Sequence, residues 1–242
     1  MSDMIGNTIQ DANRVRNRFS SYRTAKGAAG YVDPNDVGNE YDFIANKGDS
    51  FLISPEADGF TKIRIGAAWN NIKVKRDGLL GALGFSKDAN VDLDLGCLYE
   101  LADGTRGCLQ ALGSQYGSFN KPPFIRHSGD EQTGDKEGDD EFLLINGAQW
   151  SQIKRLLVYV YIYDGISDWA QVKPQIHIRL PNHKPLIATL TTHFEELDLC
   201  VIAGLENIGG GIKVNSYTEY FPGHAEMDRA FGYGIQWADG RK

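Results

Sequence analysis

Apolar and polar residues alternate along many short stretches of this chain, and turn residues separate the stretches. In residues 91–101 every odd position is apolar or aromatic, while Asp92 and Asp94 occupy the opposite face about 7 Å apart. Residues 156–163 are apolar on both faces, which is typical of a central strand covered on both sides. Shorter alternating stretches also predict strands at 50–53, 61–65, 141–145, 175–180, 186–191, 198–205, 212–220 and 233–237.

This series of short strands predicts an all-β fold with a minor helical part, built as an antiparallel two-sheet β-sandwich. Residues 223–231 are predicted to form the helix, and 73–90 a glycine-rich connection. Residues 41–242 form the predicted domain, and residues 1–40 a flexible basic N-terminal tail. The tail is either mobile or an arm for an anionic surface or a partner groove. Its basic centre consists of Arg14, Arg16, Arg18, Arg23 and Lys26.

Composition and the absence of long apolar runs indicate the cellular compartment. The first thirty residues contain no apolar run of the kind found in a signal peptide, and no stretch of eighteen apolar residues occurs. Three cysteines without paired or metal-type spacing fit a reducing compartment, so we expect a cytoplasmic protein. A sequence pI near 5.2 argues against nucleic-acid binding by the main body.

The net charge is concentrated in residues 129–141. This segment holds seven carboxylates and one lysine, a charge of −6, whereas the whole chain carries 32 acidic and 25 basic residues. Like charges at this density repel one another unless they are solvated or a cation lies among them. Oxygen donors without Cys or His favour Ca²⁺ over Mg²⁺ or Mn²⁺, although the spacing does not match a helix-loop-helix calcium loop. A solvated acidic loop and a cation site both remain open at this point.

Three motifs in order carry a family resemblance. They are Gly66-x-x-Trp69, Val-Asp-Leu-Asp-Leu at 91–95, and Gly-Asp-x-x-Thr-Gly-x-x-x-Gly-Asp-Asp-Glu at 129–141, followed by a strand that ends at Tyr163-Asp164. From about Tyr41 to the C-terminus the chain resembles the TerD-type tellurium-resistance and stress-response family, and it is more similar to the TerA branch than to TerD itself.

The resemblance implies a calcium-binding β-sandwich without an established enzymatic activity, located in the cytoplasm or at the inner face of the membrane. The family is associated with tellurite, phage and colicin resistance, and other tellurium-resistance proteins are the implied partners. Two departures, Asn70 and Lys136, would weaken or abolish one of two calcium sites. Carried over by position, the metal ligands are Asp92, Asp94, Asp130, Asp135, Asp139, Asp140 and Glu141.

Two alternatives stand beside the non-enzymatic calcium-binding prediction. Paired carboxylates are also used by metal-dependent hydrolases, and His127 would then be the candidate base. Against this, the five histidines lack a His-Glu-x-x-His spacing, and no phosphate-cradling or nucleophile-elbow motif is present. The other alternative is a metal-free interaction module with an empty acidic loop.

Overall fold

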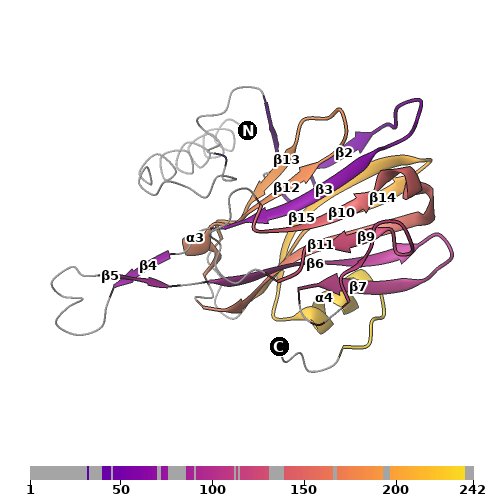
Figure 1. Cartoon of the computed structure of the whole chain (residues 1–242). Helices are drawn as coiled ribbons and strands as arrows, with labels where there is room; N and C mark the ends of the chain where they lie inside the picture. The colour runs from indigo at the N-terminus through magenta and orange to yellow at the C-terminus, as the bar shows by residue number, and fades with distance from the viewer. Residues whose placement is uncertain are drawn as a thin grey trace, which may run out of the picture.

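A computed structural model of the chain describes residue 32 and residues 40–44, 46–69, 72–75, 86–89, 91–111, 113, 115–130, 139–165, 168–192 and 197–237. About half of these residues lie in two sheets, which form the predicted antiparallel-dominated sandwich (Figure 1). The exception in direction is β1, which pairs with β13 in parallel.

Sheet A contains seven strands. Their order across the sheet is β1 (Asp42–Phe43), β13 (Leu186–Thr189), β12 (Gln175–Arg179), β3 (Lys62–Ala68), β10 (Glu141–Asn146), β9 (Ile125–His127) and β8 (Gly117–Ser118). Register pairs Gly66 of β3 with Phe142 of β10 and His177 of β12, so these three residues form one row across the sheet.

Sheet B contains six strands. Their order is β2 (Ser50–Ile53), β15 (Gly211–Phe221), β14 (Leu199–Ile208), β11 (Ile153–Asp164), β6 (Asp92–Leu101) and β7 (Arg106–Gln110). The strand β11 lies between β14 and β6, which confirms the prediction of a central strand at 156–163. The 3₁₀ helix η1 (Gly147–Gln152) connects β10 of sheet A to β11 of sheet B.

The main core fills the space between the sheets. Alternation places Ile63 and Ile65 of β3 and Leu93 and Leu95 of β6 in one buried cluster with Trp69. Burial of these apolar faces is the dominant favourable contribution to folding.

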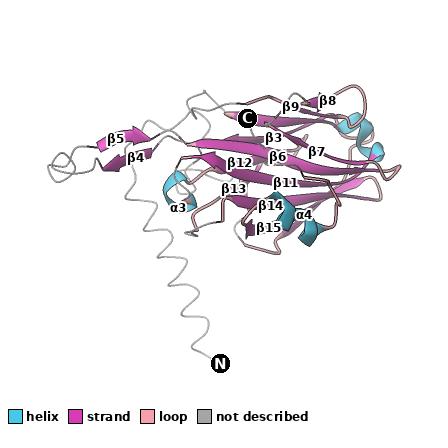
Figure 2. Cartoon of the chain, turned by 90° about the horizontal axis from the view of Figure 1, so that it is seen from below, coloured by secondary structure: helices cyan, strands magenta, loops and turns pink. Residues whose placement is uncertain are grey.

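A second apolar cluster lies on the outer face of sheet B. Helix α4 (His224–Phe231) and the residues after it cover Leu98, Tyr159 and Val201 (Figure 2). Both faces of β6 and β11 are therefore buried. The helix confirms the prediction at 223–231, and α3 (Trp169–Val172) is a further short helix.

Two local predictions were wrong. Residues 233–237 form no strand, because the carboxylate of Asp228 accepts hydrogen bonds from the amides of Tyr233, Gly234 and Ile235. The predicted connection at 73–90 contains a two-stranded ribbon, β4 (Ile72–Lys75) and β5 (Ser86–Ala89), which extends away from the sandwich (Figures 1 and 2).

The predicted N-terminal tail lies outside the described residues, apart from Val32 and Glu40. The side-chain amide of Gln175 accepts a hydrogen bond from the Val32 amide and donates one to the Val32 carbonyl, both at 2.7 Å. Gln175 is buried on β12. At Val32, therefore, the chain before the domain contacts sheet A.

Candidate metal centre

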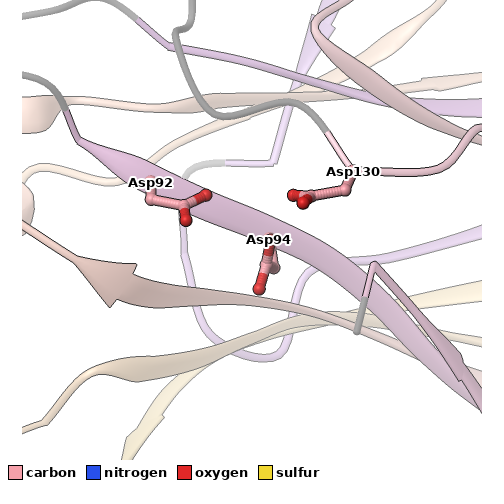
Figure 3. A group of neighbouring side chains, drawn as sticks. All are labelled: Asp92, Asp94 and Asp130. Atoms are coloured by element: carbon pink, nitrogen blue, oxygen red, sulfur yellow. The ribbon is translucent and has the colours of Figure 1, made fainter. Parts of the chain in front are cut away.

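Three carboxylates converge where β6 begins. Asp92 and Asp94 project from β6, and Asp130 projects from the chain after β9 that faces it (Figure 3). One oxygen of each residue lies within 4.8 Å of one oxygen of each of the others. Asp94 is only 2% exposed, Asp92 is half-buried and Asp130 is exposed, so the group runs from the protein interior to the surface.

The electrostatics of this group favour a cation. Two ionised carboxylates about 5 Å apart repel each other by about 3 kcal/mol at an effective dielectric constant of 20. A divalent ion among the three oxygens would convert this repulsion into attraction. The donors are all hard oxygens, and carboxylates that are mono- or bidentate suit the six to eight ligands of Ca²⁺. The residues present therefore fit calcium.

Glu141 and His127 hold the backbone next to the group. Strand β7 ends at Gln110, which pairs with Gly96, so the ladder on this side of β6 stops before Leu95. The Leu95 amide instead donates to Glu141 Oε2 at 2.7 Å, and the Leu95 carbonyl is bonded to His127 Nε2 at 2.7 Å. Both side chains come from sheet A, so they connect the two sheets across the core. Glu141 thereby satisfies a buried backbone amide.

The hydrogen bonds of His127 define its protonation state. A carbonyl only accepts, so Nε2 carries the proton that is donated to Leu95, and Nδ1 accepts from the Gly129 amide at 3.0 Å. Burial lowers the pKa of His127, which favours the same neutral form. With both ring nitrogens engaged, the imidazole has no lone pair directed at the aspartate group.

Asp140 is hydrogen-bonded to the backbone at the end of β3. Its Oδ2 accepts from the Trp69 amide at 3.0 Å, and its own amide donates to the Ala67 carbonyl at 2.8 Å. The Trp69 indole in turn donates to the Val91 carbonyl at 2.9 Å, directly before Asp92. Asp140 is thus bound to backbone groups where β3 ends, inside the sheet order.

Asp139 lies on the outer face of sheet A, where two arginines bind it. Arg64 Nε and Arg179 Nη1 each lie 2.7 Å from Asp139 Oδ2, and the Asp139 side chain is 3% exposed. His177 Nδ1 accepts from Arg179 Nη2 at 2.7 Å. Burial first, and then the Arg179 charge, lower the pKa of His177 to about 4, so this ring is neutral at neutral pH.

Gly66 makes room for this ion-pair cluster. A Cβ at position 66 would lie 2.1 Å from Asp139 Cγ, which is closer than any side chain tolerates. Arg64 also stacks over the Phe142 ring at 3.7 Å, which fixes the guanidinium on this face. The glycine of the Gly66-x-x-Trp69 motif therefore lets the Asp139 carboxylate lie against the sheet.

The structure divides the seven predicted ligands. Asp92, Asp94 and Asp130 come together, whereas Asp139, Asp140 and Glu141 bind two arginines, the Trp69 amide and the Leu95 amide. Among the described residues, the candidate ligand set is therefore the first three. Asp135, Lys136 and Asn70 lie outside the described residues. Sequence reasoning missed the arginines, and their outward positions on β3 and β12 were the only signal of them.

Comparison with known proteins agrees with the predicted resemblance. The sequence matches the TerD domain family over residues 44–185, which is more than half of the chain. The chain belongs to the TerD family. The matched region includes β3, β6, β10 and all three clustered aspartates, whereas β13 to β15 and α4 lie beyond it.

Two curated relatives are tellurium resistance proteins. This TerD-family chain is 39% identical to TerA of Alcaligenes sp over 183 residues, which cover 76% of the chain and 53% of that protein. It is 33% identical to TerZ of Serratia marcescens over 105 residues, or 41% of the chain and 49% of that protein. The chain thus spans about half the length of the curated relatives it matches.

One solved structure shows the same fold, and a second is similar over much of the chain. The crystal structure of SAV2460, a protein of unknown function, aligns with a TM-score of 0.50 at 16% identity and covers 74% of this chain and 99% of that one. A homologue of telluride resistance protein TerD from Streptomyces coelicolor A3(2) aligns with a TM-score of 0.47 at 17% identity, covering 70% of this chain and 95% of that one. In the part of the chain that the structure describes, no helix has the length and apolar character needed to cross a bilayer.

Proposed function

We propose that this tellurium-resistance family member binds calcium through Asp92, Asp94 and Asp130. The observation that carries the proposal is the convergence of three carboxylates within 4.8 Å, one of them buried. Two ligands come from a strand inside sheet B and one from the start of the acidic segment. Ion binding would therefore fix the start of that segment to the sandwich, and it would stabilise the folded state.

We propose a non-enzymatic role for the site. His127, the candidate base from sequence, donates through one ring nitrogen and accepts through the other, so it has no free site for proton transfer. The ion-ordered acidic segment would instead present a surface to a partner in the stress response. The proposed partners are other tellurium-resistance proteins, and the proposal includes peripheral contact with the inner membrane from the cytoplasmic side. Nucleic acid is not an expected partner.

Thermal unfolding with calcium, with magnesium and with chelator tests the proposal. At calcium concentrations of about one hundred times Kd, the added stability is about 2.7 kcal/mol. For a chain of this size that corresponds to a rise in Tm of about 5–10 °C. We expect a clearly smaller rise with Mg²⁺, since a site with three protein carboxylates, two of them fixed on one strand, suits the larger ion.

Asp94→Asn supplies the decisive comparison. The variant should lose the calcium-dependent rise and should have a higher Tm than the wild type in chelator, because one of the three repelling charges is gone. The matched control is Asp58→Asn, which removes an exposed carboxylate from a turn after β2. Identical curves for the wild type in all three conditions would refute calcium binding and favour the metal-free interaction module.

A further inference from the structure

The imidazole of His127 lies between the two chain segments that supply the aspartates. Its Nε2 is 2.7 Å from the carbonyl oxygen of Leu95, the residue after Asp94. Its Nδ1 is 3.0 Å from the amide nitrogen of Gly129, the residue before Asp130. One rigid, buried ring therefore connects the β6 side of the aspartate group to the Asp130 side.

The surroundings fix the ring at both ends. On the β6 side, Glu141 binds the Leu95 amide at 2.7 Å, so both polar backbone groups of Leu95 are held by side chains of sheet A. On the other side, Gly129 has a positive φ of 104°, which turns the chain so that its amide faces the ring. Tyr116 stacks on the imidazole with an interplanar angle of 26°.

We propose that His127 is a positioning residue that sets the separation between Asp94 and Asp130 and thereby the preference for calcium over magnesium. This inference rests on the proposed calcium site. Calcium–oxygen distances are about 2.3–2.6 Å, whereas Mg²⁺ requires about 2.0–2.1 Å and near-octahedral geometry. A spacing that a rigid ring holds open favours the larger ion, and a released Asp130 could close in on the smaller one.

Two substitutions each remove one of the two hydrogen bonds. The side-chain oxygen of Asn corresponds in position to Nδ1, so His127→Asn retains an acceptor for Gly129 and loses the donor to Leu95. The side-chain nitrogen of Gln corresponds to Nε2, so His127→Gln retains the donor to Leu95 and loses the acceptor for Gly129. The ring can hold the two chain segments apart only when both hydrogen bonds are made. Both variants should therefore lose the fixed separation between Asp94 and Asp130. The matched control is His183→Gln, at an exposed histidine in the loop between β12 and β13.

Competition titration with a chromophoric chelator measures Ca²⁺ and Mg²⁺ affinity of the full chain. We expect both His127 variants to bind Ca²⁺ about tenfold or more weakly, as is typical when a residue behind a metal ligand is lost, and Mg²⁺ affinity to change by less than about threefold. The Ca²⁺/Mg²⁺ affinity ratio should remain that of the wild type in His183→Gln. Folded His127 variants with the wild-type ratio would overturn the inference, whatever their Tm.

Amide hydrogen exchange in chelator gives a readout without metal. The Gly129 amide should be protected in the wild type and in His127→Asn, and should exchange about tenfold or more faster in His127→Gln. Rapid exchange in the wild type would overturn the inference without any variant. A wild type that shows a protected Gly129 amide but binds no calcium would refute the proposed function and the selectivity claim, while leaving the contact itself intact. The two failures are therefore distinguishable.

Discussion

Three consecutive acidic residues, Asp139, Asp140 and Glu141, bind three different parts of this fold. Asp139 binds Arg64 and Arg179 outside sheet A, Asp140 binds the end of β3, and Glu141 reaches β6 through the core. Each carboxylate is buried, and a buried charge is tolerated only when it is paired or fully hydrogen-bonded. At the residue scale, the acidic density of this segment therefore contributes to anchoring as well as to the candidate metal site.

Gly66→Ala tests the Asp139 contact. The added methyl group would overlap Asp139 Cγ, because the Cβ position lies 2.1 Å from that atom. We expect the carboxylate to leave the two arginines and the protein to lose about 1–3 kcal/mol, measured by urea unfolding in chelator.

Gly223→Ala is the control for this substitution. Its φ of 179° is extended backbone, and the nearest atom to an added Cβ is Glu226 Oε2 at 3.5 Å. This variant should remain within about 0.5 kcal/mol of the wild type. A Gly66→Ala protein as stable as the control would show that the Asp139 contact contributes little to folding.

At the scale of the element, α4 and the residues after it act as a cover on sheet B. Asp228 accepts hydrogen bonds from three consecutive amides at 2.6–2.9 Å and from the Trp237 indole at 3.1 Å. Arg155 donates to the Phe231 carbonyl at 3.1 Å and stacks over Tyr233 at 4.1 Å. A single carboxylate thus replaces the strand that alternation had predicted for this segment.

Asp228→Asn should release the C-terminal segment. The amide group of Asn would direct a donor at backbone donors, so we expect a loss of about 2–4 kcal/mol and faster amide exchange at residues 233–235. Exchange followed by mass spectrometry or NMR measures this directly. The control is Glu226→Gln on the exposed side of the same helix, which should leave exchange at 233–235 unchanged. Equal protection in both variants would contradict the role of Asp228.

At the scale of the whole molecule, neutral histidines that are fully or partly buried couple stability to pH. Burial lowers the pKa of His127, and it lowers the pKa values of His177 and His224 to about 4. The unfolded chain binds protons at these positions near pH 6.5, before the folded chain does. The contribution of these histidines to the free energy of unfolding is therefore fully present above about pH 6.5 and is lost as the pH falls toward 4.

His224→Phe tests this dependence. His224 packs against Tyr161 and Trp237, and Phe retains an aromatic ring there without a titrating group. Between pH 7.5 and pH 5, urea midpoints in chelator should fall less steeply for the variant than for the wild type. His183→Gln, at an exposed loop position, should follow the wild-type curve. If His224→Phe also follows the wild-type curve, His224 does not contribute to the pH dependence of stability.

Local patterns predicted most of this architecture because strand alternation depends on neighbours in sequence. They predicted β6, β11 and α4, and they placed Asp92 and Asp94 together on one strand. Local patterns could not predict contacts between residues far apart in the sequence. The partners of Asp139 lie 75 and 40 residues away, and the cover over sheet B depends on Asp228 contacting a segment whose alternation alone favours a strand. The acidic motif thus located the candidate site and left open which carboxylates belong to it.

Two fixed residues within the acidic segment have a consequence for protein engineering. Gly129 is held by His127, and Asp139 is held by Arg64 and Arg179, so the nine positions 130–138 connect two anchored points. Each doubling in the length of such a connection costs only about 0.6 kcal/mol of closure entropy. We therefore expect this segment to accept an inserted reporter peptide, whose signal would follow ion binding at the adjacent Asp130.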